Sequence, residues 1–153
     1  MGKIDLSINK EGLAHNIKKA KENGIIIPTF AEMQHPETIP EKIQEKLKSV
    51  GMWDVNPLNL FRITWKNEAK ESGGLFQAVP NYIELPPALT GVPCRIVAMV
   101  GKWFPTGCHK VGASFGCLAP RLVTGQFDAT YHHAVWPSTG NYCRGGAFNS
   151  KLL

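Results

Sequence analysis

The sequence predicts an α/β protein, in which residues 81–153 begin a parallel-sheet, three-layer sandwich and residues 1–80 form a mainly helical and irregular N-terminal extension. The first observation is a change in composition: residues 1–70 hold 11 basic and 9 acidic side chains, whereas residues 71–153 hold only 6 and 3. The second is a strand–loop–helix–strand–loop–helix pattern after residue 80, which is the repeating unit of a parallel sheet. We therefore expect two regions, of which the α/β domain is incomplete.

The N-terminal extension is predicted to start with an amphipathic helix. Leu13, Ile17 and Ala20 fall on one face at helical spacing. Asn9 precedes them as an N-cap, and Gly24 follows them where a C-terminal stop belongs. We expect this helix to serve packing or dimerisation rather than chemistry.

A second helix is expected to begin at a capping box. Thr38 and Glu41 have the T-x-x-E spacing, and Gly51 ends the segment. The apolar stripe of this helix consists of Ile43, Leu47 and Val50. Residues 52–80 are predicted to be irregular, with aromatic side chains that anchor the segment onto a core. These anchors are Trp53, Phe61 and Trp65.

The second half of the chain contains the predicted α/β unit. Residues 95–100 form a nearly all-apolar run, which is typical of a parallel strand buried on both faces. A loop at 101–109 leads into a helix, and a second strand at 134–136 leads through a loop at 137–141 into a helix near Tyr142. The apolar stripe of the first helix is Val111, Phe115, Leu118 and Leu122. In such a unit both loops lie at one sheet edge, where ligands bind, so we expect them to converge.

Lys110 is the candidate reactive residue of the first loop. The nearest acidic residues in the chain are Glu84 and Asp128, both far from it. A desolvated lysine without an acidic partner shifts toward its neutral amine, which attacks aldehydes to form imines. The alternative is a surface lysine at a helix start, although the helix dipole favours anions rather than cations there.

The second loop is a candidate anion site. Residues 137–141, Pro-Ser-Thr-Gly-Asn, supply hydroxyls, an amide and backbone N–H groups at a helix start. The alternative is an ordinary helix cap, because Ser, Thr and Asn are the favoured cap residues. Together with Lys110 on the neighbouring loop, an imine-forming amine beside a carboxylate cradle indicates an amino-acid site.

The remaining composition bounds the partners. The net charge is +5, but no basic tract or basic–aromatic stripe is present, so nucleic-acid binding is not expected. No run reaches the roughly 18 apolar residues of a membrane helix, and no signal peptide is evident, so we expect a cytoplasmic protein that does not enter membranes. The four cysteines lack C-x-x-C spacing, which predicts reduced thiols and no metal site. The glycine motifs of nucleotide-binding loops are also missing, which argues against a nucleotide-binding domain.

Two short motifs carry a resemblance to a known family. Gly-Cys-His-Lys-Val at 107–111 resembles the lysine segment, and Ser-Thr-Gly-Asn at 138–141 resembles the asparagine loop, of fold-type II pyridoxal-phosphate-dependent enzymes. The segments 83–86 and 89–91 also resemble the family's entry segment. This family includes the tryptophan synthase β-subunit, cysteine synthase, threonine synthase and the serine/threonine dehydratases, and the His-Lys pair is most similar to the tryptophan synthase β-subunit. The resemblance covers about residues 80–153.

The resemblance implies pyridoxal 5'-phosphate as cofactor and a tryptophan synthase β-like fold. Lys110 would form the Schiff base with the cofactor and then act as acid and base at the substrate α-carbon. His109 would help to hold the cofactor phosphate, and Asn141 would hydrogen-bond the cofactor's ring hydroxyl. The substrate carboxylate would be held by Ser138, Thr139 and Gly140. The implied function is that of a lyase or synthase performing elimination or replacement chemistry on an amino acid.

The chain also departs from the family pattern. The family's glycine-rich phosphate cup comes after the asparagine loop, and these 153 residues do not contain it. Two or three strands would leave apolar sheet edges uncovered. We therefore expect a fragment, one piece of a split enzyme or the product of a degraded gene, with a homo-oligomer or a complementing chain as the assembly. The alternative function is a non-catalytic interaction subunit or remnant chain that retains the fold's first half, so activity of the isolated chain stays an open question.

Overall fold

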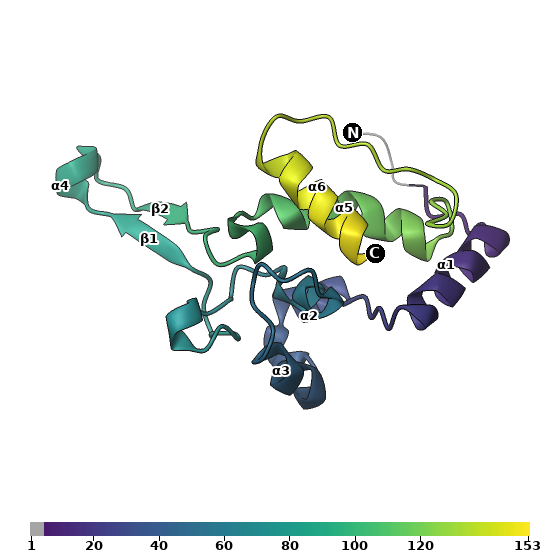
Figure 1. The fold of residues 1–153 in the computed structure, drawn as a ribbon. Helices are drawn as coiled ribbons and strands as arrows, with labels where there is room; N and C mark the ends of the chain where they lie inside the picture. Colours follow the sequence, from purple (N-terminus) through teal and green to yellow (C-terminus); the bar gives the residue numbers. More distant parts are fainter. Residues whose placement is uncertain (1–4) are drawn as a thin grey trace.

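The computed structural model describes residues 5–153. The first four residues of the predicted extension lie outside the described residues, and so does the part of the chain on which the expectation of no signal peptide depends. A helical body carries a projecting two-stranded hairpin (Figure 1). The helices are α1 (Lys10–Glu22), α2 (Phe30–Gln34), α3 (Glu41–Leu47), α4 (Pro87–Thr90), α5 (Lys110–Val123) and α6 (Asn141–Leu152), with 3₁₀ turns at Pro36–Thr38, Pro57–Arg62, Lys70–Ser72 and Pro105–Gly107, and the strands are β1 (Tyr82–Leu85) and β2 (Ile96–Met99). Between residues 5 and 153, no helix combines the length and apolar character required to cross a membrane.

Helix α1 begins at the predicted cap. The Asn9 side chain accepts a hydrogen bond from the backbone N–H of Gly12 at 3.1 Å. Gly12 packs so closely on Gly125 that an added Cβ would lie 2.2 Å from the Gly125 carbonyl oxygen. The Asn16 amide donates to the backbone carbonyls of Leu122 and Phe127 at 2.9 and 2.7 Å. These contacts fasten α1 to the end of α5 and the loop that follows it.

A histidine–aspartate hydrogen bond adds to this attachment. His15 Nδ1 lies 2.8 Å from Asp128 Oδ2. The Thr130 hydroxyl also donates to Asp128, at 2.6 Å. These hydrogen bonds, from Thr130 first and then from His15, lower the pKa of Asp128 to about 2. The carboxylate therefore stays charged wherever the protein is folded at ordinary pH.

The second predicted helix starts differently from the expectation. Thr38 does not cap it, because the Thr38 hydroxyl donates to the His35 carbonyl at 2.7 Å within a 3₁₀ turn. Helix α3 begins at Glu41, two residues later than a Thr38 cap would give. The capping box occurs earlier, where Thr29 and Glu32 satisfy each other's backbone N–H groups at the start of α2. The T-x-x-E spacing is thus present twice, and the competing 3₁₀ turn decides which copy caps a helix.

Residues from both sides of position 80 build one central core. Its buried members are Met33, Leu60, Ile63, Phe104, Val111, Phe115, Ala119 and Leu152. A smaller cluster under α3 contains Ile39, Ile43, Leu47 and Phe61. Of the three predicted aromatic anchors, Phe61 is buried and Trp65 is half-buried, whereas Trp53 is 62% exposed. The N-terminal extension is therefore packed directly on the helices that follow the two loops.

A buried arginine holds the irregular part of the extension. The Arg62 guanidinium donates to the backbone carbonyls of Leu47, Val50 and Gly74 and to the Asn59 side chain. Burial lowers the pKa of Arg62 from its ordinary value, but four acceptors compensate the loss of water. One side chain thereby fixes three stretches of backbone that have little regular structure.

Helices α5 and α6 lie side by side and run in the same direction (Figure 1). The predicted stripe on α5 is buried as expected: Val111, Phe115, Leu118 and Leu122. Gly145 of α6 allows the contact, since a Cβ there would lie 2.7 Å from the Val111 Cα atom. The Asn149 amide donates to the Val111 carbonyl and to Ser114 Oγ, both at 2.8 Å. The starts of the two helices consequently lie at the same end of the pair.

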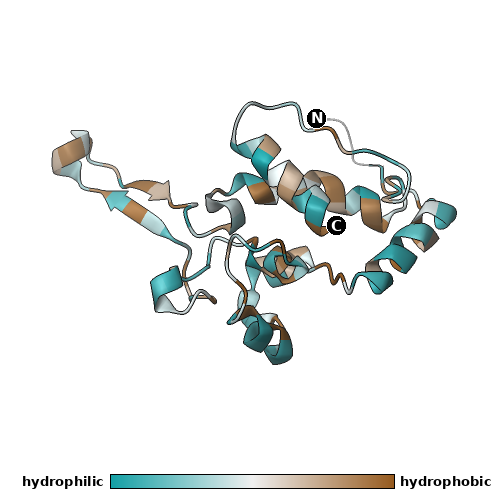
Figure 2. Cartoon of the chain, viewed as in Figure 1, coloured by the Kyte–Doolittle hydropathy of each residue, from teal (hydrophilic) through white to brown (hydrophobic). Residues whose placement is uncertain are grey.

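The strand at 95–100 differs from the predicted parallel strand. Strand β2 pairs antiparallel with β1, with Tyr82 opposite Met99 and Leu85 opposite Ile96. Most of its side chains are exposed, and Figure 2 shows hydrophobic residues on both strands of this projecting hairpin. The short connection through α4 favours antiparallel pairing, because a parallel pair needs a long crossover. Among residues 5–153 the sheet consists of this pair alone.

The predicted strand at 134–136 is an irregular segment in the structure. Its Trp136 lies against Gly146 and donates from Nε1 to Ser150 Oγ at 3.0 Å. The segment thus packs on α6 rather than pairing with a strand. The apolar residues 134–136 led to the prediction of a strand. The largest of them, Trp136, packs on the surface of α6 instead.

Replacing a leucine by alanine should have a large effect on stability in the core and almost none in the hairpin. We expect Leu60→Ala to lower the free energy of unfolding by roughly 2–5 kcal/mol, because Leu60 is fully buried. Leu89→Ala, at the hairpin tip where Leu89 is 71% exposed, should change it by less than about 0.5 kcal/mol. Urea unfolding followed by circular dichroism measures both, and equal losses would contradict this location of the core.

The α5–α6 contact predicts opposite signs for two glycine substitutions. Gly145→Ala should destabilise the protein by about 1–3 kcal/mol, since the new methyl group meets the backbone of Val111. Gly116→Ala, in the middle of α5 with nothing within 4 Å of the added Cβ, should stabilise it by about 0.5–1 kcal/mol through helix propensity. Thermal unfolding of both variants checks the pair, and a stabilising Gly145→Ala would show that the helices are further apart.

Candidate functional site

Lys110 is the first residue of α5, directly after a tight turn. Thr106 in that turn has φ 68°, which is the left-handed region that non-glycine residues rarely adopt, and Gly107 follows with φ 68°. Thr106 is 2% exposed, and its hydroxyl oxygen has no hydrogen-bond partner among the described residues. A strained backbone and an unpartnered buried hydroxyl therefore mark the entry to the lysine.

The Lys110 side chain is exposed. Within residues 5–153 it makes no ion pair, in line with the absence of acidic neighbours in the sequence. Burial does not desolvate the amine in this structure, which differs from the expectation that reactivity would come from desolvation. The amine is sterically accessible to a ligand.

The loop at 138–141 is exposed along its whole length. Ser138 Oγ accepts a hydrogen bond from the Gly140 backbone N–H at 3.2 Å, and Asn141 is the first residue of α6. No side chain caps this helix. The first N–H groups of a helix have no partner within it, so the start of α6 offers free donors to an anion.

The two helix starts are joined, but their candidate side chains do not touch. Arg144 Nη1 donates to the Thr106 carbonyl at 3.0 Å, which ties the first turn of α6 to the loop before Lys110. Gly145 supports the same contact, since its added Cβ would lie 2.9 Å from the Lys110 carbonyl carbon. In the described part of the chain, no hydrogen bond links Lys110 to residues 138–141.

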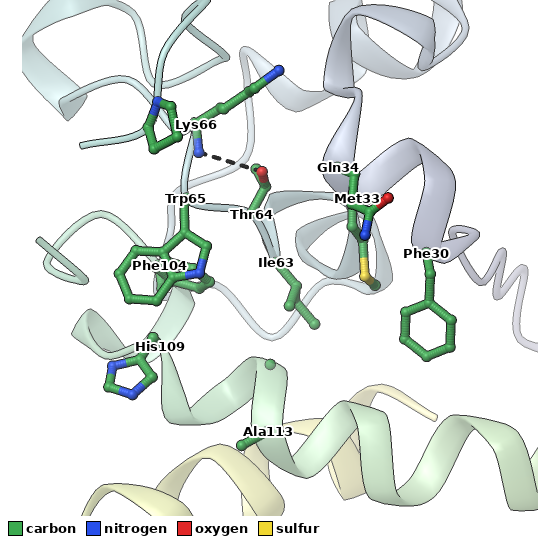
Figure 3. A pocket seen from close by; sticks show the side chains of 12 residues that line it. Phe30, Met33, Gln34, Ile63, Thr64, Trp65, Lys66, Phe104, His109 and Ala113 are labelled. Carbon is green, nitrogen blue, oxygen red and sulfur yellow. Dashed lines mark hydrogen bonds between the residues drawn. The ribbon is translucent and has the colours of Figure 1, made fainter. Parts of the chain in front are cut away.

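His109 belongs to a different surface from Lys110. Its ring stacks on Trp65 with ring centres 5.3 Å apart and an angle of 27° between the planes. His109 lines a cleft of about 510 Å³ between α2, the segment at 63–66 and the first turns of α5 (Figure 3). Lys110 is not among the residues that line this cleft. The pair His109–Lys110 thus places one side chain in the cleft and the other beside it.

A tyrosine–cysteine contact between the start of α6 and the middle of α5 was not expected from the sequence. The Tyr142 hydroxyl donates to Cys117 Sγ at 3.5 Å, across the α5–α6 contact. This hydrogen bond, and burial to a lesser degree, raise the pKa of Tyr142. Two positions in the sequence could have indicated this contact. Tyr142 comes directly after Asn141, and Cys117 comes two helical turns after Lys110.

The thiols and the acidic groups form no metal site in the described region. All four cysteines are free: Cys94, Cys108, Cys117 and Cys143. Within residues 5–153, no group of three or more His, Cys, Asp or Glu side chains has an arrangement that would hold a metal ion. The groups available at the helix starts are therefore an amine, hydroxyls, an amide, backbone N–H groups and the free thiols of Cys108 and Cys143.

Comparisons with protein-family models, with curated proteins and with solved structures give no match to this chain.

Proposed function

We propose that this chain carries the lysine end of a pyridoxal 5'-phosphate site and belongs to a lyase or synthase that performs elimination or replacement chemistry on an amino acid. One observation carries the proposal. Lys110 and the loop at 138–141 lead into two parallel helices whose first turns are in contact through Gly145 and Arg144. An amine and a set of anion donors are thereby held at one end of a rigid helix pair.

The residues present fit an anionic cofactor that carries an aldehyde. The Lys110 amine is exposed and its only neighbours in the first turn are apolar or hydroxyl-bearing, so no carboxylate competes for it. The Thr106 hydroxyl, in the turn before Lys110, is buried and has no hydrogen-bond partner among the described residues. The start of α6 offers N–H groups that no side chain caps, and such groups favour phosphate and carboxylate groups.

Each candidate side chain has a proposed task. Lys110 would hold the cofactor covalently and would move a proton at the substrate α-carbon. His109 would contact the cofactor phosphate through a ring nitrogen while its face stays on Trp65. Asn141 would donate to the cofactor's ring hydroxyl. The substrate carboxylate would be held by Ser138, Thr139 and Gly140. When bound, pyridoxal phosphate supplies an electron sink for the charge that develops on the α-carbon.

The proposed enzyme includes polypeptide beyond the described residues. Ile83 and Val97 are 57% and 46% exposed on opposite faces of a hairpin that has two free edges. An isolated two-stranded hairpin is marginal in water, and strands covered on both faces have this kind of all-apolar sequence. We therefore propose that further strands, from a complementing chain or another copy, complete a three-layer sandwich of the tryptophan synthase β-like type. A cytoplasmic location accords with the four free thiols.

The hairpin also supports a second candidate function. A chain whose apolar arm is uncovered and whose Lys110 is open to water has the surface of an interaction subunit without activity of its own. The two candidates differ in whether Lys110 reacts with an aldehyde cofactor, which can be measured directly.

Cofactor trapping tests the main proposal. We expect pyridoxal phosphate followed by borohydride reduction to label the protein on Lys110, because its amine is accessible and the neighbouring helix α6 starts with uncapped N–H groups. Peptide mapping by mass spectrometry locates the label. The Lys110→Ala variant should lose it.

A nearby lysine provides the matched control. Lys102 is also exposed and lies in the loop before α5, with its amine 4.5 Å from the Trp103 ring centre. Lys102→Ala should keep the label on Lys110. Labelling spread evenly over exposed lysines, or none on Lys110, contradicts the cofactor site and favours the interaction subunit.

A further inference from the structure

The cleft beside His109 has the dimensions and lining of a small-molecule site. Its volume of about 510 Å³ lies within the range of roughly 300–1,000 Å³ that is typical of ligand pockets. Figure 3 shows Trp65, Phe104 and His109 along one side, Met33 and Phe30 along the other, and Ile63 between them. Residues from the N-terminal extension thus form most of its wall, and α5 closes the remaining side at Gly112 and Ala113.

The aromatic side of the cleft favours a planar ligand. The Trp65 ring stacks on His109, and Phe104 meets the edge of Trp65 with ring centres 5.0 Å apart. These rings hold one another in place, so they form a fixed aromatic wall. Aromatic pairs at such spacings gain about 0.5–1.5 kcal/mol beyond their burial.

The charge at the rim favours an anion. Lys66 lines the cleft, its side chain is only 19% exposed, and no carboxylate of residues 5–153 lines the same space. Its amine lies 3.6 Å from Glu37, which is longer than the roughly 2.7–2.9 Å of a charge-assisted hydrogen bond. Glu37 itself is 60% exposed and bonds His35 at 3.0 Å. The Lys66 cation is therefore mostly buried and only loosely paired.

We propose that this cleft binds a planar aromatic carboxylate, with the ring against Trp65 and His109 and the carboxylate on Lys66. The binding site rests on the cleft alone. His109 directly precedes Lys110, so the cleft could hold the side chain of the amino-acid substrate or the second reactant. This role rests on the proposed function.

Three probes of similar shape test the proposal with the 153-residue chain. These are 2-naphthoate, the neutral 2-naphthylmethanol and the saturated decahydro-2-naphthoate, titrated while the indole N–H resonance of Trp65 is followed, its assignment fixed with Trp65→Phe. We expect 2-naphthoate to bind at least about tenfold more tightly than the alcohol, as a charge-assisted hydrogen bond requires. It should bind roughly three- to tenfold more tightly than the saturated acid, because that acid cannot stack.

Two variants and a control locate the binding. Lys66→Met should remove the preference for 2-naphthoate over the alcohol, and Ala113→Phe should weaken both by at least about tenfold by filling the cleft. Lys21→Met, at an exposed lysine of α1, should change neither the preference for 2-naphthoate nor the affinity for either probe. Circular dichroism confirms that each variant is folded, and the two cleft substitutions keep the proposal testable if one of them is not.

Specific outcomes overturn the proposal. They are a lack of saturable binding up to about 1 mM, equal affinity for 2-naphthoate and the alcohol, or an unchanged preference in folded Lys66→Met. Trapping of pyridoxal phosphate on Lys110 is measured on the same samples. Binding of 2-naphthoate without a label on Lys110 would refute the cofactor site and leave the cleft, whereas a label without binding would refute the cleft alone.

Discussion

The close contact between Gly145 and Val111 is the constraint on which the candidate site depends. A side chain at position 145 would meet the Val111 backbone, so only glycine lets α6 approach α5 this closely. The hydrogen bonds from Asn149 then fix the register of the two helices. Because both helices run in the same direction, their N-terminal ends and the loops before them lie together. The first turns of α5 and α6 are thus held together by Gly145 and Arg144, although no bond joins the side chains of Lys110 and Asn141.

The N-terminal extension supports that helix pair rather than standing apart from it. Leu60 and Ile63 share a core with Phe115 of α5, and the extension forms most of the wall of the cleft beside His109. Its backbone is largely irregular, so the fixed geometry comes from side-chain hydrogen bonds such as those of Arg62. Removing an acceptor from a buried guanidinium is costly, which explains how irregular segments keep one arrangement.

Local signals in the sequence predicted the helices well. The cap at Asn9 and the apolar stripe of α5 need only residues a few positions apart, and both are present in the structure. Strand pairing depends on partners that local patterns do not reveal, so the run at 95–100 was correctly seen as extended, whereas its antiparallel partner β1 was not foreseen. The Thr38 capping box failed because a 3₁₀ turn competes for the same hydroxyl. The cleft could not be predicted, since Phe30, Trp65 and His109 are joined only by packing.

The order of His109 and Lys110 links the cleft to the candidate cofactor site. Neighbouring residues at a helix start point about 100° apart, so one backbone position can serve two surfaces. His109 takes part in the aromatic wall built by the extension, and Lys110 stays accessible beside the start of α6. In the proposed arrangement the extension contacts both the ring of the cleft ligand, through Trp65, and its carboxylate, through Lys66, and the same extension shares the core of α5.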